Sequence, residues 1–257
     1  AGKLDTLGQS GITFPMRFLG VIPARYQSTR FPGKALAEIG GKTLIQWVWE
    51  RTLRSRKLDQ AVVATDDERI AEAVAAFGGQ AMMTRDDHQS GTDRVAEVAQ
   101  RIESDCYINI QGDEPLIAFE TIDALCVKLE ETPQAEVVTA RVPLEDESEA
   151  RNPNINKVVV DHSGRALYFS RSPIPYPRNR PAGYFKHLGI YGYRRSFLLR
   201  LGTLRPSHLE RTEALEQLRL LENGISIYVV DSKADSIGVD TPEDLERVRA
   251  LLQNGAK

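Results

Sequence analysis

Short apolar runs alternate with longer segments of helical periodicity along the first half of the chain. The run Phe18–Ile22 is almost continuously apolar, as expected for a strand that is buried on both faces. From Thr43 to Arg56 the apolar positions recur every three or four residues, which is typical of an amphipathic helix, and Thr43 can cap it. The alternation continues to Val142 and predicts strands at 18–22, 60–65, 81–84, 106–110 and 136–142, with helices at 43–56, 66–77, 91–103 and 119–131. This order predicts an α/β fold, a mostly parallel sheet with helices on both faces.

The pattern changes after Val142, where six of the 13 prolines fall within a short stretch. Two strand-like pieces at 157–161 and 166–169 flank the turn sequence His162-Ser163-Gly164, which predicts a hairpin rather than another strand–helix–strand unit. Periodicity then returns and predicts strands at 187–193 and 225–230 and helices at 196–202, 209–222 and 242–252. We therefore expect a core made of residues 16–142 and 187–257, a β-rich insertion at 143–186 and an N-terminal extension at 1–15.

Charge and composition exclude several classes of protein. With 33 basic and 36 acidic residues, the net charge is −3, so there is no basic excess of the kind that binds nucleic acid. No stretch approaches the roughly 18 apolar residues of a membrane span, and the first residues do not resemble a signal peptide. Cys106 and Cys126 are too few for a disulfide framework or a zinc site and are expected to be buried thiols. We expect a cytoplasmic enzyme without membrane insertion, in which a few local cations hold any anionic ligand.

A cationic loop follows the first predicted strand, at the carboxyl edge where open α/β sheets bind ligands. Residues 23–34 read PARYQSTRFPGK and place Arg25, Arg30 and Lys34 around a glycine-containing turn, which suits the phosphates of a nucleotide. The loop has neither the GxxxxGK[ST] nor the GxGxxG spacing, which disfavours a P-loop ATPase and a dinucleotide-binding fold. On its own, the same loop is also compatible with a solvated basic surface.

Two carboxylates, each next to a predicted strand or helix, are candidate metal ligands. Asp113 follows the predicted strand 106–110 in the turn Gln111–Pro115, and Asp240 precedes the predicted helix at Pro242. Magnesium takes one or two protein carboxylates and completes its shell with phosphate oxygens and water. Alone, Asp113 is also compatible with a ligand-free turn and Asp240 with a capping carboxylate beside the N-cap Thr241.

Together with the segment TRDDHQSGTDR at 84–94, these clusters resemble the 3-deoxy-manno-octulosonate cytidylyltransferases, also called CMP-Kdo synthetases. The resemblance runs from about Arg17 to Leu251, and its most specific segments include IPARYQSTRFPGK, NIQGDEP, KHLGIYGYR, LEQLRLLENG and GVDTPEDLERVR. It implies a Rossmann-like nucleotidyltransferase sheet that transfers CMP from CTP to the anomeric hydroxyl of 3-deoxy-D-manno-octulosonate (Kdo). The products are CMP-Kdo, for lipopolysaccharide biosynthesis, and pyrophosphate. It also implies Mg²⁺ as cofactor and a homodimer, with the insertion in dimerisation and sugar binding.

The resemblance implies particular site residues. Those of the nucleotide site are Ala24, Arg25, Ser28, Lys34, Arg85, Ser90 and Gly91. Those of the sugar site are Gln111, Arg171, His187, Tyr191, Glu216 and Gln217. Asp113 and Asp240 are implied as the Mg²⁺ ligands and, with Lys34, as the catalytic residues; Arg171 would pair with the sugar carboxylate.

Each of the sugar-site residues has an alternative without a ligand. His187 and Tyr191 fit ordinary sheet positions, Glu216 and Gln217 fit an exposed helix face, and Arg171 fits an ion pair across the insertion. Two other functions also remain open: a cytidylyltransferase for 8-amino-Kdo or sialic acid, and a non-catalytic nucleotide-sugar sensor. The sensor is disfavoured because it need not keep both Asp113 and Asp240.

Overall fold

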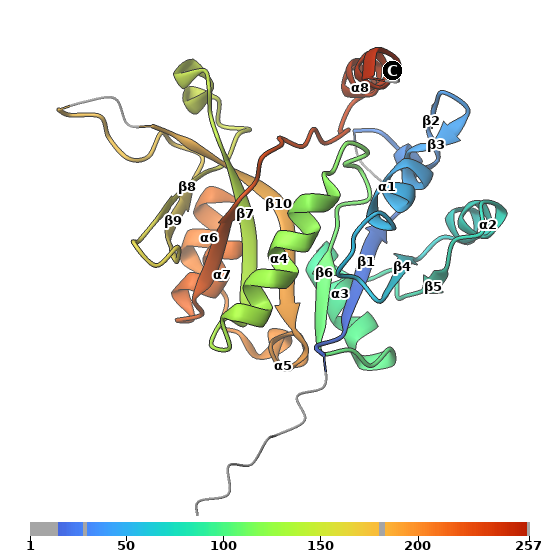
Figure 1. Cartoon of the computed structure of the whole chain (residues 1–257), viewed down its shortest axis with the longest axis horizontal. Coiled ribbons are helices and arrows are strands. Elements are labelled where there is room, and N and C mark those ends of the chain that lie inside the picture. Colours follow the sequence, from blue (N-terminus) through green and yellow to red (C-terminus); the bar gives the residue numbers. More distant parts are fainter. Residues whose placement is uncertain (1–14, 28–29, 180–182, 256–257) are drawn as a thin grey trace, which may run out of the picture.

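Most strands belong to one twisted sheet, which runs through the middle of the computed structural model (Figure 1). The structure describes residues 15–27, 30–179 and 183–255, so the expected N-terminal extension lies almost entirely outside the described residues. The path through the sheet is β11-β7-β10-β6-β1-β4-β5. These strands are β1 (Phe18–Ala24), β4 (Gln60–Thr65), β5 (Ala81–Met83), β6 (Cys106–Asn109), β7 (Val137–Pro143), β10 (Phe185–Arg194) and β11 (Ile227–Asp231).

The predicted mostly parallel sheet is confirmed. Strand β1 pairs in parallel with both β4 and β6, β4 with β5, and β7 with β11. Strand β10 is antiparallel to β6 and to β7 and joins the two parallel parts. A short hairpin of β2 (Glu38–Ile39) and β3 (Lys42–Thr43) forms a separate two-stranded sheet.

Hydrophobic cores cover both faces of the sheet. Neighbouring residues of β1 enter different cores. Ile22 packs with helices α1 (Leu44–Thr52), α2 (Glu68–Ala76) and α4 (Phe119–Glu131), whereas Val21 packs with α3 (Gly91–Arg101), α5 (Arg195–Leu198) and α7 (Gln217–Glu222). Side chains alternate between the faces of a strand, so burial on both faces requires apolar residues at successive positions. This explains why the run Phe18–Ile22 is continuous rather than alternating.

Side-chain caps set the starts of several helices. Thr43 accepts a hydrogen bond from the Gln46 amide, as predicted for α1. Ser90 and Asp93 form a reciprocal capping box at α3. In α8 (Pro242–Gly255), Asp244 accepts from the Thr241 amide and hydroxyl, and its own amide donates back to Thr241 Oγ1, which confirms the predicted cap.

The insertion contains the predicted hairpin. Strands β8 (Lys157–Val160) and β9 (Ala166–Ser170) are antiparallel, and β8 joins the main sheet by pairing Lys157 with Lys186 of β10. Both cysteines are buried free thiols, as expected. Within the described ranges, no helix is long and apolar enough to cross a membrane.

One predicted helix is wrong. Residues 209–222 form two helices, α6 (His208–Glu213) and α7 (Gln217–Glu222), separated at Ala214, whose φ of 51° is left-handed. Arg171 of the insertion donates to the carbonyls of Glu213 and Ala214 at 2.6 and 3.2 Å, and so satisfies the end of α6. The predicted helix 196–202 is likewise shorter, with α5 (Arg195–Leu198) followed by a 3₁₀ turn at Leu201–Thr203.

Candidate functional site

A cavity of about 260 Å³ opens at the carboxyl ends of β1 and β6, where the sequence placed its polar clusters. Of the residues expected to bind the nucleotide or the metal, those that line it are Ala24, Arg25, Lys34, Ser90, Gly91, Asp113 and Asp240. Gln111, expected at the sugar, lines it as well. Ser28 lies outside the described residues.

Lys34 joins the two carboxylates. Its Nζ lies 2.5 Å from Asp113 Oδ2 and 3.0 Å from Asp240 Oδ1, and it also donates to the Val239 carbonyl at 3.0 Å. Burial lowers the pKa of Lys34, but the attraction and hydrogen bonds of Asp113 and Asp240 outweigh it and raise the pKa above its usual value. Burial raises the pKa of Asp240, but Lys34 and Arg30, which lies 2.9 Å away, bring the net shift below the usual range. Lys34 and Asp240 therefore both stay charged at neutral pH.

Two glycines bring these groups together. Gly33 has a left-handed φ of 71° and its amide donates to the Tyr26 carbonyl at 2.8 Å, which closes the loop just before Lys34. At Gly112 a Cβ would lie 2.6 Å from the Pro23 carbonyl, so only glycine lets the turn after β6 approach the end of β1 this closely. That approach places Asp113 opposite Lys34.

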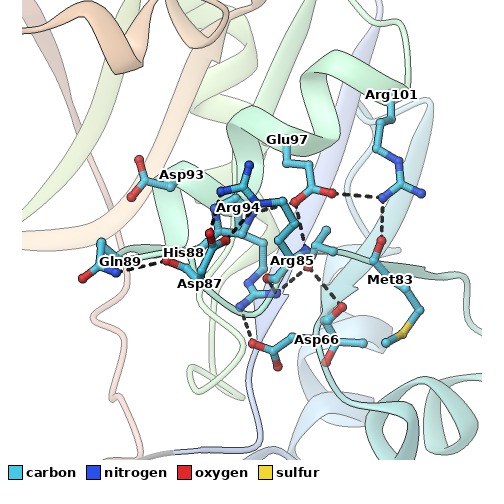
Figure 2. A network of polar contacts seen from close by, with 12 residues as sticks. Asp66, Met83, Arg85, Asp87, His88, Gln89, Asp93, Arg94, Glu97 and Arg101 are labelled. Atoms are coloured by element: carbon cyan, nitrogen blue, oxygen red, sulfur yellow. Dashed lines mark hydrogen bonds and ion pairs between the residues drawn. The ribbon is translucent and has the colours of Figure 1, made fainter.

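The segment Thr84–Gln89 ends in His88 and Gln89, which line the cavity, and it is held by side chains of α3 (Figure 2). Arg94 donates to Thr84 Oγ1, to the Arg85 carbonyl at 3.2 Å and to Asp66 at 2.6 Å. Glu97 accepts from the Arg85 amide at 3.0 Å and lies 2.6 Å from His88 Nε2. These bonds fix the backbone that presents His88, Gln89 and Ser90 to the cavity.

Arg85 was expected in the nucleotide wall, but its side chain is not among the described residues that line the cavity. Its guanidinium makes a double hydrogen bond with Asp87 at 2.8 Å and is exposed. Arg94, which the sequence analysis did not select, lines the cavity instead and is almost completely buried. A signal was available: Arg94 lies three residues after Gly91 and so projects near the same end of the helix.

A second cavity of about 160 Å³ adjoins the first and shares Gly91 and Gln111 with it. Of the residues expected at the sugar, Gln111, Tyr191, Glu216 and Gln217 line it. The sequence analysis missed Thr92, Asn109, Tyr193 and Leu220. Strand periodicity would have found Tyr193, because it is two residues from Tyr191, and Asn109 is the direct partner of Tyr191 across β6 and β10.

Glu216 connects the two cavities. Ser90 Oγ donates to Glu216 Oε1 at 3.3 Å, so the cap of α3 and the start of α7 meet at the boundary. Burial raises the pKa of Glu216, which is partly opposed by hydrogen bonds from Thr92 and Ser90. The rings of Tyr191 and Tyr193 stack at 5.7 Å and form an aromatic wall. The second cavity thus combines apolar faces with a few directed polar groups.

Two expected sugar-site residues do not line either cavity among the described residues. The guanidinium of Arg171 donates hydrogen bonds to the carbonyls of Pro153, Glu213 and Ala214. Arg171 therefore links the insertion to the end of α6. His187 is buried behind Tyr191, with 5.5 Å between the ring centroids. Burial lowers the pKa of His187 to about 3, so the ring is neutral.

Comparison with known proteins gives a consistent result. Residues 19–227 match the family model described as "Cytidylyltransferase". The chain is 53% identical to the 3-deoxy-manno-octulosonate cytidylyltransferase of Solibacter usitatus, over 93% of this chain and 96% of the relative. It is also 53% identical to the enzyme of that name from Syntrophotalea carbinolica, over 93% of this chain and 99% of the relative. The solved structure of a CMP:2-keto-3-deoxy-manno-octonic acid synthetase complexed with CTP superimposes with a TM-score of 0.90 at 49% identity, covering 93% of this chain and 99% of that one.

Proposed function

The chain belongs to the cytidylyltransferase family, among the 3-deoxy-manno-octulosonate cytidylyltransferases, and on this premise we propose how its residues carry out that reaction. The enzyme transfers CMP from CTP to the anomeric hydroxyl of Kdo and releases pyrophosphate. The observation that carries the proposal is a pair of adjoining cavities, one with a charged Lys34–Asp113–Asp240 cluster and one with an aromatic wall.

The first cavity is proposed to hold CTP. Arg25, Arg30 and Lys34 supply positive charge for the triphosphate, and amide groups of the loop after β1 add hydrogen-bond donors. The wall around Ser90 and Gly91 then faces the cytidine. Phosphoryl transfer depends chiefly on in-line positioning and neutralisation of phosphate charge, which this cavity is suited to supply.

Asp113 and Asp240 are the proposed Mg²⁺ ligands. Among the described residues no group of three or more His, Cys, Asp or Glu side chains is arranged to hold a metal. Two carboxylates fit Mg²⁺ nevertheless, since its shell is normally completed by phosphate oxygens and water. When bound there, the ion would neutralise phosphate charge and lower the pKa of a coordinated hydroxyl. Lys34 already holds the two carboxylates close together through its hydrogen bonds.

The second cavity is proposed to hold Kdo. Gln111 lies at the junction of the two cavities, and its Nε2 donates to the Gly189 carbonyl at 2.8 Å, so its orientation is fixed. Glu216 and Gln217 are suited to bond sugar hydroxyls, while Tyr191 and Tyr193 offer ring faces. The sugar's reacting hydroxyl would therefore enter from the side of Gln111 toward the phosphates. Arg171 is also a proposed partner of the sugar carboxylate. To bind it, the guanidinium would release the backbone carbonyls that it now contacts.

The reaction is tested by measuring pyrophosphate release with CTP and Kdo, with Mg²⁺ and after its removal by EDTA. We expect release that requires all three components. Parallel assays with 8-amino-Kdo and sialic acid test the two neighbouring specificities, because pocket groups rather than the phosphate loop decide between such substrates. Binding of CTP and Kdo without any release would instead favour a nucleotide-sugar sensor.

We further propose that the protein works in the cytoplasm as a homodimer, with the core 16–142 and 187–257 binding the nucleotide and the insertion 143–186 at the dimer interface. The exposed side chains of Leu167 and Tyr176 in the insertion support this proposal. Light scattering at micromolar concentration tests it, since a monomer there would rule the dimer out. Changing Leu167 and Tyr176 to Ser is expected to shift the mass toward the monomer.

A further inference from the structure

The C-terminal helix α8 packs in a small apolar core of its own, apart from the two cores that cover the main sheet. Figure 1 shows α8 beside the β2–β3 hairpin, at the end of a long connection from β11. The buried residues of this third core are Ile39, Leu44, Val239, Leu245 and Val248, and none of the five belongs to a sheet core. The buried apolar partners of α8 therefore come from the hairpin, the start of α1 and the connection itself.

Hydrogen bonds support the same docking. Arg249 of α8 donates to the Glu38 carbonyl of β2 at 3.0 Å. Trp47 of α1 donates from Nε1 to the Ile39 carbonyl at 2.9 Å. The hairpin is thus bonded to both helices and provides a fixed surface for α8.

Val239 connects the third core to the charged cluster. Its side chain is fully buried in that core. Its amide donates to the Asp113 carbonyl at 2.9 Å, and its carbonyl accepts from Lys34 Nζ at 3.0 Å. The next residue is Asp240, whose carboxylate lies 3.0 Å from the same Nζ. One residue that belongs to the third core therefore contacts both sides of the cluster.

Asp240 depends on this docking for its position. Residues 232–241, which lead from β11 to α8, form no helix or strand, so no regular element holds Asp240 from that side. Helix α8 has 14 residues, a length at which a helix is only marginally stable in water without tertiary packing. Val248 supplies such packing, since it is fully buried in the middle of α8. Among the described residues, those that line the two cavities do not include Val248.

We propose that Val248 is a positioning residue for the reaction: by docking α8 in the third core, it holds Val239 between Asp113 and Lys34 and so keeps Asp240 beside Asp113. The inference rests on the proposed function, because it concerns the two carboxylates that are proposed to bind Mg²⁺. It assigns the assembly of the charged cluster to a helix that lines neither proposed substrate cavity.

Hydrogen exchange at the Val239 amide reports the docking, since its bond to Asp113 must open before the proton exchanges with solvent. NMR measures the exchange in the protein without CTP, Kdo or Mg²⁺. Val248→Ala removes two buried methyl groups, and we expect exchange at Val239 to become about tenfold faster. Val248→Asp places a charge in the third core, and we expect exchange to become at least about 100-fold faster.

Leu251→Asp is the matched control. It introduces the same charge into the same helix, but at a residue that is 43% exposed. We expect exchange at Val239 to stay within about twofold of the wild type, because a charge at an exposed position is not desolvated. The same acceleration in Leu251→Asp, or unchanged exchange in folded Val248→Asp, would overturn the docking of α8 as the cause.

The Mg²⁺ dependence of pyrophosphate release tests the positioning role. In Val248→Asp we expect the half-saturating Mg²⁺ concentration to rise at least about tenfold, because only the docked fraction presents both carboxylates. At saturating Mg²⁺ kcat should return to within about threefold of the wild type, since the ion binds the docked form and shifts the population toward it. The KM for Kdo should stay within about twofold. An unchanged Mg²⁺ requirement in a variant with fast exchange at Val239 would overturn the positioning role, and so would an equal rise in the KM for Kdo.

Circular dichroism establishes that each variant is folded, as expected for changes outside the two sheet cores. If Val248→Asp does not fold, the milder Val248→Ala decides both measurements, with an expected rise in exchange and a smaller rise in the Mg²⁺ requirement. The proposed function fails in a different way, by the absence of pyrophosphate release from the wild-type protein. Exchange at Val239 is measured without turnover, so it still decides whether Val248 holds the cluster in that case.

Discussion

The ammonium of Lys34 lies 2.5 Å from Asp113 Oδ2 and also holds Asp240, which is 206 residues further along the chain. Three separate segments thus converge on one cation: the loop after β1, the turn after β6 and the approach to α8. Two carboxylates this close would repel each other without a cation between them. The three side chains are therefore in contact before any substrate binds.

Asp113→Asn tests the importance of this cluster for the reaction. The amide has nearly the same size but lacks the negative charge that would hold a metal ion, so we expect kcat to fall at least about 100-fold, the usual loss for a group that stabilises charge in the transition state. Pyrophosphate release measures the effect. Glu103→Gln is the control, because Glu103 is an exposed carboxylate with only a 4.0 Å ion pair to Arg17. Equal activities of the two variants would contradict the role of Asp113.

Glu216→Gln tests the boundary between the cavities. Glu216 accepts from Ser90 at 3.3 Å and lines the second cavity only, so we expect the KM for Kdo to rise about tenfold and the KM for CTP to stay within about twofold. Steady-state kinetics with each substrate varied in turn give the two values. Glu72→Gln, an exposed change on α2, controls for the general effect of losing a carboxylate. A rise confined to the KM for CTP would assign Glu216 to the nucleotide instead.

The sequence predicted the sheet well because its strands are buried on both faces and its helices carry recognisable caps. Thr43, Ser90 and Thr241 each cap the helix that follows through bonds within a few residues. The break at Ala214 could not be predicted in this way, since residues 209–222 keep helical periodicity throughout. The break is stabilised by Arg171, which reaches the end of α6 from the insertion, and such a tertiary contact overrides local propensity.

The site was predicted in its parts but not in every side chain. Their positions after predicted strands placed Lys34 and Asp113 at one edge of the sheet, and the family resemblance added Asp240. The structure brings the three into contact. Spacing does not reveal that Asp87 binds the guanidinium of Arg85. With Arg85 held there, Arg94 lines the cavity in its place. Spacing also does not reveal the register shift between Leu188 and Tyr191 in the pairing of β10 with β7.

Arg94→Met tests the network of Figure 2 through stability. The Arg94 side chain is 5% exposed and bonds the partly buried Asp66 at 2.6 Å, so its loss leaves this carboxylate without its cation. We expect the free energy of unfolding to fall by about 3–5 kcal/mol. The matched control is Arg69→Met, which breaks an ion pair of the same length with Asp67 at a side chain that is 57% exposed, and we expect a much smaller loss there. Urea denaturation measures both, and similar losses would show that burial is not the deciding factor.

His187→Gln tests the buried neutral histidine through pH. In the folded protein burial lowers the pKa of His187 to about 3, below its ordinary value of 6.5, so only the unfolded chain takes up a proton as the pH falls below 6.5. Its contribution to stability is therefore complete above pH 6.5 and is lost progressively toward pH 3. Between pH 7 and pH 5 the wild type should lose about 2 kcal/mol more than the glutamine variant, from about 1.4 kcal/mol per pH unit. Urea unfolding at the two pH values measures the free energy of unfolding of both proteins. An equal loss in the wild type and in the glutamine variant would contradict a buried neutral His187.

Ala214→Gly tests the turn that separates α6 from α7 and so places Glu216 at the cavity. Ala214 is exposed and has a φ of 51°, a conformation that is strained for alanine but not for glycine. Glycine removes this strain at little loss of packing, and we expect the free energy of unfolding to rise by about 0.5–1 kcal/mol even though glycine also gains entropy in the unfolded chain. Ala75→Gly is the matched control, because Ala75 is an exposed alanine in the right-handed helix α2, where the same change should lower stability by about 0.5–1 kcal/mol. Thermal and urea unfolding should thus give opposite signs for the two variants, and a loss in both would mean that residue 214 is not held in the left-handed conformation.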